Sequence, residues 1–240
     1  MDTDTYLAHL DRDAGRFAAA IAAGRLDAPV AACPGWDLRE LTLHMGHVHR
    51  WATAAVEHGV RPSFVGDAPH DAELATWLRQ GVTSLTGTLA TADPHAPTWH
   101  PFPFEQQVWV WARRQAHETA VHRWDAEVAA TGTSTLDPML AADGIGELVE
   151  MLLPRVLSRE QVAPPGASLA IRCTDVDGAW SLRTQDGSYR AVVGEHPSDG
   201  ELRGTAAALL LVLMGRAARA TVEVRGDPAA AQTWLALPGL

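Results

Sequence analysis

Glu118 and His122 are the two residues of this chain whose types and spacing best suit chemistry. They stand four positions apart in a segment whose pattern indicates a helix, so both side chains project from one face, about one turn apart. The same face continues through Val108 and Trp111 upstream and Ala129 downstream, which is a stripe that should point at a core. A buried carboxylate needs a compensating partner, and a metal ion is one of the few that suffices. The pair therefore predicts part of a metal site.

His44 is the best candidate for the missing ligand. Asp37 and Glu40 have the spacing of a helix N-cap and its capping-box partner, so a helix is expected to begin there. The apolar stripe of that helix places His44 in its middle and runs through Leu41, His44, Val48, Trp51 and Ala55. His47 lies three residues from His44 and could flank the same cavity.

Other polar residues near these segments are given different roles. His49 is expected to face away from the apolar stripe, and His117 to lie on the surface. Asp125, one turn beyond His122, could accept a hydrogen bond from a ligand imidazole, or could be a solvated, cap-like carboxylate near the helix end. Arg216 could hold an anionic substrate group, although its position favours a simpler role at the C-terminus of a leucine-rich helix.

Two imidazoles and one carboxylate leave positions open for water or substrate, which is typical of a catalytic metal site. Such an ion acts as a Lewis acid, or lowers the pKa of a bound water or thiol until a nucleophile exists at neutral pH. Zinc is the default metal, and nickel and iron accept the same ligands. The alternative is that His44, Glu118 and His122 are three separately satisfied polar residues, since the Glu-x-x-x-His spacing is common in helices.

The hydrophobic pattern divides the chain into two domains. Helical spacing predicts four helices, at about residues 3–23, 37–55, 74–89 and 105–130, which together suit a four-helix bundle with inward-facing metal ligands. A further helix is expected at 140–157. Beyond it the period shifts toward two, which predicts strands at 168–173, 180–184, 189–193, 200–203 and 220–225, with helices at 205–214 and 228–237. We therefore predict an α+β protein with a helical domain at 1–160, including the connecting helix, and a small α+β domain with a mainly antiparallel sheet at 161–240.

Composition excludes several classes of function. The 240 residues carry 19 Lys and Arg against 29 Asp and Glu, and no basic run could follow a phosphate backbone, which argues against nucleic-acid binding. No apolar stretch approaches the roughly 20 residues that a bilayer requires, and the N-terminus is acidic where a secretory signal would be basic, so we expect a cytoplasmic protein that spans no membrane. Cys33 and Cys173 match no metal or redox spacing and are expected to be reduced, buried thiols. Trp99 and Trp111 could pack in the core or line a pocket mouth. No heptad repeat indicates an oligomeric state.

Several motifs, in order, resemble the maleylpyruvate isomerase family of mycothiol-dependent enzymes, within the DinB-like metalloprotein superfamily. They are Cys33-Pro34-Gly35-Trp36-Asp37, then Leu43-His44-Met45-Gly46-His47-Val48-His49-Arg50-Trp51, then His117-Glu118 through His122-Arg123-Trp124-Asp125. The later runs Leu213-Met214-Gly215-Arg216 and Val222-Glu223-Val224-Arg225-Gly226-Asp227 resemble that family's second domain, of sterol-carrier-like topology.

The resemblance implies a DinB-like bundle in which His44, Glu118 and His122 match the family's metal ligands, usually zinc. It also implies that mycothiol, a low-molecular-weight thiol, delivers its sulfur to the metal as thiolate. In the isomerase this thiolate would add to a conjugated double bond, permit rotation and leave again, whereas in related transferases the thiol stays on a small electrophilic substrate. Arg216 matches a family arginine that could hold a carboxylate.

Two rival functions remain open at this stage. The first is a metal-dependent hydrolase that uses bound water in place of the thiol. The second is a binding protein that keeps the bundle but has lost catalysis.

Overall fold

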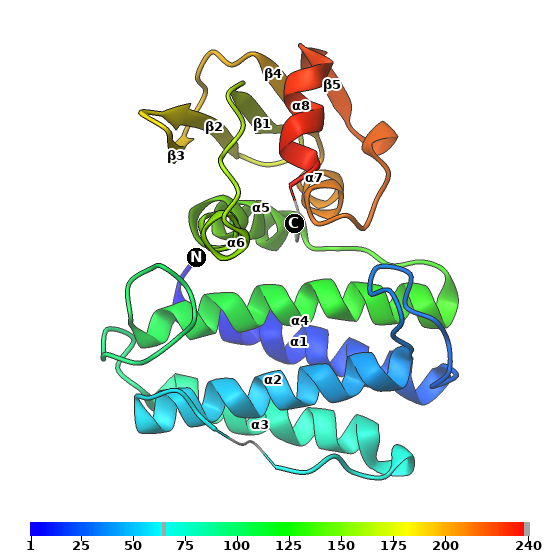
Figure 1. The fold of residues 1–240 in the computed structure, drawn as a ribbon. Coiled ribbons are helices and arrows are strands. Elements are labelled where there is room, and N and C mark those ends of the chain that lie inside the picture. Colours follow the sequence, from blue (N-terminus) through cyan, green and yellow to red (C-terminus); the bar gives the residue numbers. More distant parts are fainter. Residues whose placement is uncertain (64–65, 238–240) are drawn as a thin grey trace. The chain divides into compact units, whose positions relative to one another are not determined.

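The computed structural model describes residues 1–63 and 66–237, and in it the chain forms two compact units (Figure 1). Unit 1 comprises residues 1–101 and 105–136, and unit 2 comprises residues 102–104 and 137–240. Residues 64–65 of the predicted first domain and 238–240 of the predicted second lie outside the described part.

Unit 1 is built from four long helices that lie side by side (Figure 1), which confirms the predicted helical N-terminal region. They are α1 (Thr3–Ala23), α2 (Leu38–His58), α3 (Leu74–Thr91) and α4 (Val108–Thr131). Helix α4 packs against both α1 and α2, so side chains from α2 and α4 can meet inside the unit. Among the described residues, no helix combines the length and the apolar character that crossing a bilayer requires.

The start of α2 follows the local chemistry predicted for it. Asp37 accepts a hydrogen bond from the backbone N–H of Glu40, and the Glu40 carboxylate accepts one from the N–H of Asp37. This capping box satisfies backbone donors that the first helical turn would otherwise leave without partners. At the other end, Gly59 adopts φ 69°, a left-handed conformation that stops the helix.

The buried face of α2 differs from the predicted stripe by about one position. Its fully buried residues include Leu38, Leu41, Met45, His49 and Ala52, while His44 lies at the edge of this face and is partly exposed. The reason is tertiary, because α2 packs against α3 and α4 together, and the direction of these two neighbours decides which arc of the helix is covered.

Unit 2 contains the predicted, mainly antiparallel sheet. Its strands are β1 (Leu169–Cys173), β2 (Ala179–Gln185), β3 (Ser188–Val193), β4 (Gly200–Gly204) and β5 (Glu223–Gly226), in the order β3-β2-β1-β4-β5. Among the strand pairs of the described residues, only β1–β4 is parallel, with Leu169 opposite Gly200. Two helices follow strands of this sheet, α7 (Ala206–Leu213) and α8 (Pro228–Leu235). The predicted strand at 220–225 begins only at Glu223, because a 3-10 turn (Arg219–Thr221) takes up its first residues.

The segment between the bundle and the sheet belongs by its contacts to unit 2, whereas the sequence placed it with the first domain. It consists of α5 (Pro138–Glu147), a π-helical turn (Leu148–Leu152) and α6 (Leu153–Glu160) in place of the single helix predicted at 140–157. Helix α5 packs against α7, a contact between segments far apart in sequence that no local pattern reveals.

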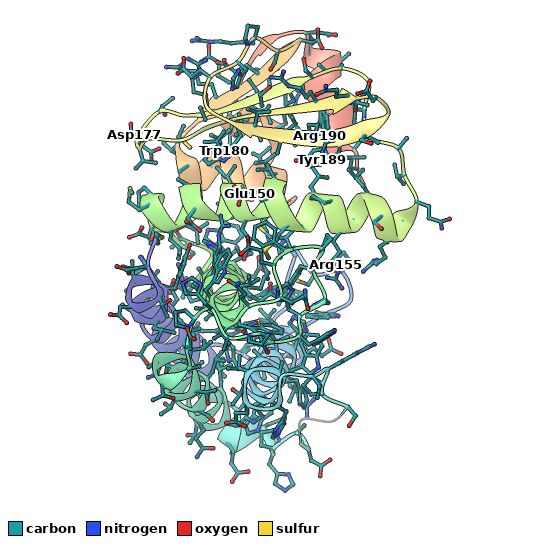
Figure 2. The ribbon with its side chains drawn as sticks, turned by 90° about the vertical axis from the view of Figure 1, so that its left-hand side faces the viewer. Glu150, Arg155, Asp177, Trp180, Tyr189 and Arg190 are labelled. Atoms are coloured by element: carbon teal, nitrogen blue, oxygen red, sulfur yellow. The ribbon has the colours of Figure 1, made fainter. Side chains whose placement is uncertain are left out.

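Tyr189 of β3 lies near the helical segment that carries Glu150 (Figure 2), and its hydroxyl completes the hydrogen bonding of the π-helical turn. In this turn the N–H of Leu153 bonds to the carbonyl of Leu148, five residues back, so the next carbonyl, that of Val149, would pair with the nitrogen of Pro154. Proline has no N–H, and the Tyr189 hydroxyl donates to Val149 instead, at 2.7 Å. Burial raises the pKa of Tyr189, and the charge of Glu150 adds to this effect.

Candidate metal centre

Helices α2 and α4 bring together the three predicted ligands. Nε2 of His44 lies 3.5 Å from Oε1 of Glu118, and Nε2 of His122 lies 3.5 Å from the same oxygen. One ligand atom from each residue lies within 4.8 Å of the other two. Glu118 and His122 come from adjacent turns of α4, as their spacing predicts, while His44 reaches them from α2.

Aromatic contacts fix the orientation of His44. Its ring meets that of His122 nearly edge to face, with centroids 5.4 Å apart and an interplanar angle of 78°. The Trp36 ring packs against it at 5.0 Å. Trp36 belongs to the tight turn before α2, in which its N–H donates to the carbonyl of Cys33. The turn that starts the helix therefore also supports one side of the site.

The site is partly open to solvent. The side chains of His44, Glu118 and His122 are 33%, 18% and 11% exposed. Burial above all, together with repulsion from the neighbouring His122 and Arg114, lowers the pKa of His44 to about 4. At neutral pH the His44 imidazole is therefore neutral and presents a nitrogen lone pair, which is the form that binds a metal.

Arg114 is a charged neighbour of the site that the sequence-based prediction missed. It stands one turn before Glu118 on α4 and forms an ion pair through Nη2 with Oε2 of that carboxylate. The oxygen that faces the two histidines is the other one, Oε1. The sequence already contained a signal for this ion pair, because Arg114 precedes Glu118 by the same four positions that separate Glu118 from His122.

Asp125 makes the hydrogen bond that its spacing suggests. Its Oδ2 lies 2.9 Å from Nδ1 of His122, and the side chain is fully buried. A carboxylate can only accept in this contact, so Nδ1 carries the proton and Nε2 presents its lone pair toward Glu118 and His44. The alternative of a solvated carboxylate at the helix end is excluded by its burial.

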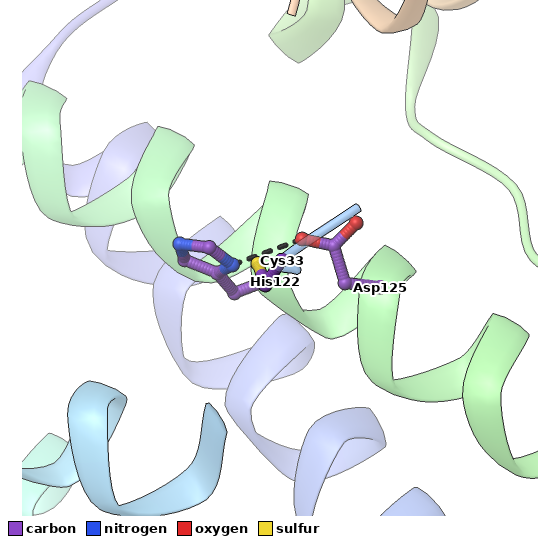
Figure 3. A group of neighbouring side chains, drawn as sticks. All are labelled: Cys33, His122 and Asp125. Carbon is purple, nitrogen blue, oxygen red and sulfur yellow. Dashed lines mark hydrogen bonds and ion pairs between the residues drawn. The ribbon is translucent and has the colours of Figure 1, made fainter. Parts of the chain in front are cut away.

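Cys33 joins His122 and Asp125 in a second group of polar atoms (Figure 3). Its sulfur, a nitrogen of His122 and a carboxylate oxygen of Asp125 all lie within 4.8 Å of one another. Both cysteines of the chain are free thiols, Cys33 half-buried and Cys173 buried. No spacing links Cys33 to His122 and Asp125, which stand far along the sequence, so only the folded chain reveals this group.

Two histidines lie where the sequence did not place them. His49 was expected to face away from the core, but it is completely buried and shares a hydrogen bond of 2.9 Å with Thr119 of α4. His117 was expected on the surface, but it is only 3% exposed and its ring meets that of Tyr6 in α1. His49 is covered because α2 packs against both α3 and α4, and His117 is covered because α4 packs against α1 as well as α2.

The remaining candidates around the bundle lie outside the metal centre. His47 meets the ring of Trp77 in α3 at 5.2 Å and is not among the grouped ligand atoms. Trp111 is 1% exposed and donates to the carbonyl of Trp99, so it packs in the core and does not line a pocket mouth. Trp99 is half-buried.

Arg216 belongs to unit 2, directly after α7. Its backbone N–H donates to the carbonyl of Leu211 at 2.7 Å, and its guanidinium donates to the carbonyl of Met214 at 2.8 Å. It therefore satisfies carbonyls at the C-terminal end of a helix, which is the simpler of its two predicted roles. A role in holding an anionic substrate group stays a prediction.

Comparisons with known proteins agree with this architecture. The family model described as the mycothiol maleylpyruvate isomerase N-terminal domain matches residues 7–127, and the model for the C-terminal domain of the same family matches residues 139–233. Crystal structures of the mycothiol-dependent maleylpyruvate isomerase and of a mutant of it each have the same fold, with a TM-score of 0.65 over 95% of both chains, at 11% and 10% sequence identity. No curated protein matches the chain at a significant level. The chain belongs to the mycothiol maleylpyruvate isomerase family.

Proposed function

We propose that this protein is a divalent-metal-dependent enzyme that activates mycothiol, a low-molecular-weight thiol, for isomerisation of a small electrophilic substrate or for sulfur transfer to it. The observation that carries the proposal is the convergence of His44, Glu118 and His122 on one point between α2 and α4. Family membership supports mycothiol as the thiol.

The spacing of the three donors fits a metal ion. In a tetrahedral site with bonds of roughly 2.0–2.2 Å, neighbouring ligand atoms lie roughly 3.3–3.6 Å apart. Oε1 of Glu118 lies 3.5 Å from Nε2 of His44 and 3.5 Å from Nε2 of His122. Two imidazoles and one carboxylate suit zinc best, and nickel and iron accept the same set.

A divalent cation at this position would supply Lewis acidity and hold a thiol in its deprotonated, nucleophilic form. The residues of the chain would prepare the site for it. His44 is neutral because of its low pKa, His122 is held in one tautomer by Asp125, and Arg114 neutralises the outer oxygen of Glu118. Three protein ligands leave room for a thiol, and the partial exposure of His44 gives access to it.

The test is metal analysis combined with a mycothiol-binding titration on the wild type, Glu118→Gln and His47→Ala. His47→Ala is the matched control, because this histidine lies on α2 three residues from His44 but packs against Trp77. We expect about one divalent metal per chain in the wild type and the control, with thiol binding that requires the metal, and loss of both in Glu118→Gln.

Turnover of a model electrophile with and without mycothiol separates the proposal from its rivals. Activity that requires the thiol supports it. Activity without any thiol would indicate a hydrolase that uses bound water. Unchanged metal content in Glu118→Gln would overturn the ligand assignment.

A further inference from the structure

His122 presents each of its two ring nitrogens to a different set of metal-ligating atoms. Nε2 faces Oε1 of Glu118 and lies beside the His44 ring, whereas Nδ1 faces Oδ2 of Asp125 at 2.9 Å. Cys33 stands on the Asp125 side of the ring (Figure 3), with its sulfur within 4.8 Å of a ring nitrogen of His122 and of a carboxylate oxygen of Asp125. One imidazole therefore separates two groups of different chemistry.

The second group differs from the first in the softness of its donors. His44, Glu118 and His122 offer two nitrogens and an oxygen, whereas Cys33, His122 and Asp125 offer sulfur, nitrogen and oxygen. Thiolate sulfur selects soft, thiophilic cations such as cadmium and copper(I) over harder ones. Asp125 is buried in α4, and Cys33 is held in place by the turn before α2, in which its N–H donates to the carbonyl of Val30. Both outer ligands therefore come from ordered backbone.

The same three residue types could also form a nucleophilic triad, but the arrangement does not fit one. In a triad the base bonds the nucleophile through one ring nitrogen and the orienting carboxylate through the other. Here Nδ1 is taken by Asp125, and Nε2 faces Glu118 on the far side of the ring. A metal site, in which sulfur and carboxylate share one side of the imidazole, fits the arrangement better.

We propose that Cys33, His122 and Asp125 form a second metal site, selective for thiophilic cations, which competes with the site at His44 and Glu118 for the His122 ring. A neutral imidazole has one proton and one lone pair. A cation on Nδ1 requires the proton to move to Nε2, which removes the lone pair that the first site needs. The two sites are therefore filled alternately, and a thiophilic cation at Cys33 displaces the metal of the first site.

This inference shares His122 with the proposed function, and cadmium binding followed through thiolate-to-metal absorbance in the near ultraviolet tests it separately. The chain has two cysteines, so Cys173→Ser is the matched control for Cys33→Ser. We expect about one cadmium ion per chain with a thiolate band in the wild type and in Cys173→Ser. The band should disappear in Cys33→Ser, and cadmium affinity should fall at least tenfold in Asp125→Asn.

The variant His44→Ala distinguishes failure of the two proposals. It removes a ligand of the first site only, so the cadmium–thiolate band should persist while zinc content falls. Zinc lost in His44→Ala with no thiolate band in any protein would overturn the second site and leave the first standing. A thiolate band with zinc content unchanged in His44→Ala would support the second site and overturn the first. A band that survives in Cys33→Ser would place the cation at Cys173 and overturn this inference.

Discussion

Oδ2 of Asp125 lies 2.9 Å from Nδ1 of His122, so a buried carboxylate sets the tautomer of an imidazole whose other nitrogen faces Glu118. Carboxylates in this position orient a ligand histidine and increase its basicity. The contact links a predicted metal ligand to the interior of α4. Its removal should alter metal binding even though Asp125 is not itself a ligand of the first site.

Asp125→Asn should lower zinc affinity about 10- to 100-fold, in the range found for such supporting partners. The asparagine amide can donate to Nδ1, which would move the imidazole proton to Nε2 and block the ligand position. Competition with a chromophoric zinc chelator measures the effect. Unchanged affinity in Asp125→Asn would mean that the hydrogen bond has no role in metal binding.

Arg114→Met should destabilise the metal-free protein more than the metal-bound protein. Without metal, Glu118 loses the cation that neutralises its Oε2, and stability should fall by about 1.5–3 kcal/mol. With metal, the carboxylate regains a positive partner, so zinc should raise the melting temperature more in the variant than in the wild type. Thermal melts with chelator and with excess zinc measure both effects, and Arg114→Lys, which keeps the charge, should resemble the wild type. Equal zinc-induced shifts in all three proteins would mean that the metal does not replace the positive charge that Arg114 gives to Glu118.

Local spacing predicted the part of the site that lies on one helix. Glu118, His122 and Asp125 are placed by helical periodicity alone, and the capping box at Asp37 fixed where α2 begins. His44 was correctly grouped with Glu118 and His122, although the buried face of α2 lies about one position away from the predicted stripe. The grouping holds because His44, at the edge of that buried face, still faces α4.

The features that the sequence did not predict depend on tertiary packing. Cys33 approaches His122 through the turn before α2, and the burial of His49 and His117 depends on which helices surround α4. The strands were placed well where alternation was regular, as in β2 and β3, and less well at 220–225, where a 3-10 turn precedes the strand. Patterns within one element were therefore predictable, whereas contacts between elements were not, apart from the approach of His44 to Glu118 and His122.

Tyr189→Phe should destabilise unit 2 by about 1–2 kcal/mol. The Tyr189 hydroxyl donates to the carbonyl of Val149, which has no helical donor because Pro154 lacks an N–H. Phenylalanine cannot donate, so the substitution removes this hydrogen bond. Hydrogen exchange followed by mass spectrometry should show faster exchange in α6 and β3, with unit 1 unchanged. Uniformly faster exchange throughout the chain would point to a general loss of stability and against a local role.

Acid should destabilise the bundle partly through His49. Burial above all, together with repulsion from Arg50, His44 and His122, lowers the pKa of this imidazole from 6.5 to about 3. Between these two values the unfolded chain binds a proton that the folded chain does not, so the free energy of unfolding falls as the pH falls. The slope is about 1.4 kcal/mol per pH unit for one such group. His44, with a pKa of about 4, acts in the same direction over a narrower window.

His49→Gln should therefore flatten the dependence of stability on pH between about pH 6 and pH 4. Denaturant unfolding at several pH values measures the slope in the wild type and the variant. His58→Gln, which changes an exposed histidine at the end of α2, is the control and should keep the wild-type slope. A slope that is the same in all three proteins would mean that His49 is not neutral in the folded state over this range.

Gly46 allows α2 and α3 to approach closely, and Gly87 provides a matched comparison in α3. A Cβ atom on Gly46 would overlap the Trp77 ring. The Arg50 guanidinium also packs over this ring, 4.1 Å from the ring centroid. A Cβ atom on Gly87 would meet nothing within 4 Å. In a helix, alanine is favoured over glycine by about 1 kcal/mol, so helix propensity alone would stabilise both variants equally.

Gly87→Ala should raise the free energy of unfolding by about 1 kcal/mol, because only the helical preference changes. Gly46→Ala should lower it by about 1–2 kcal/mol, because overpacking costs more than the preference returns. Denaturant unfolding of both variants against the wild type gives the two signs directly. A stabilised Gly46→Ala would show that Trp77 moves aside at little cost, and that the contact between α2 and α3 does not depend on the missing side chain.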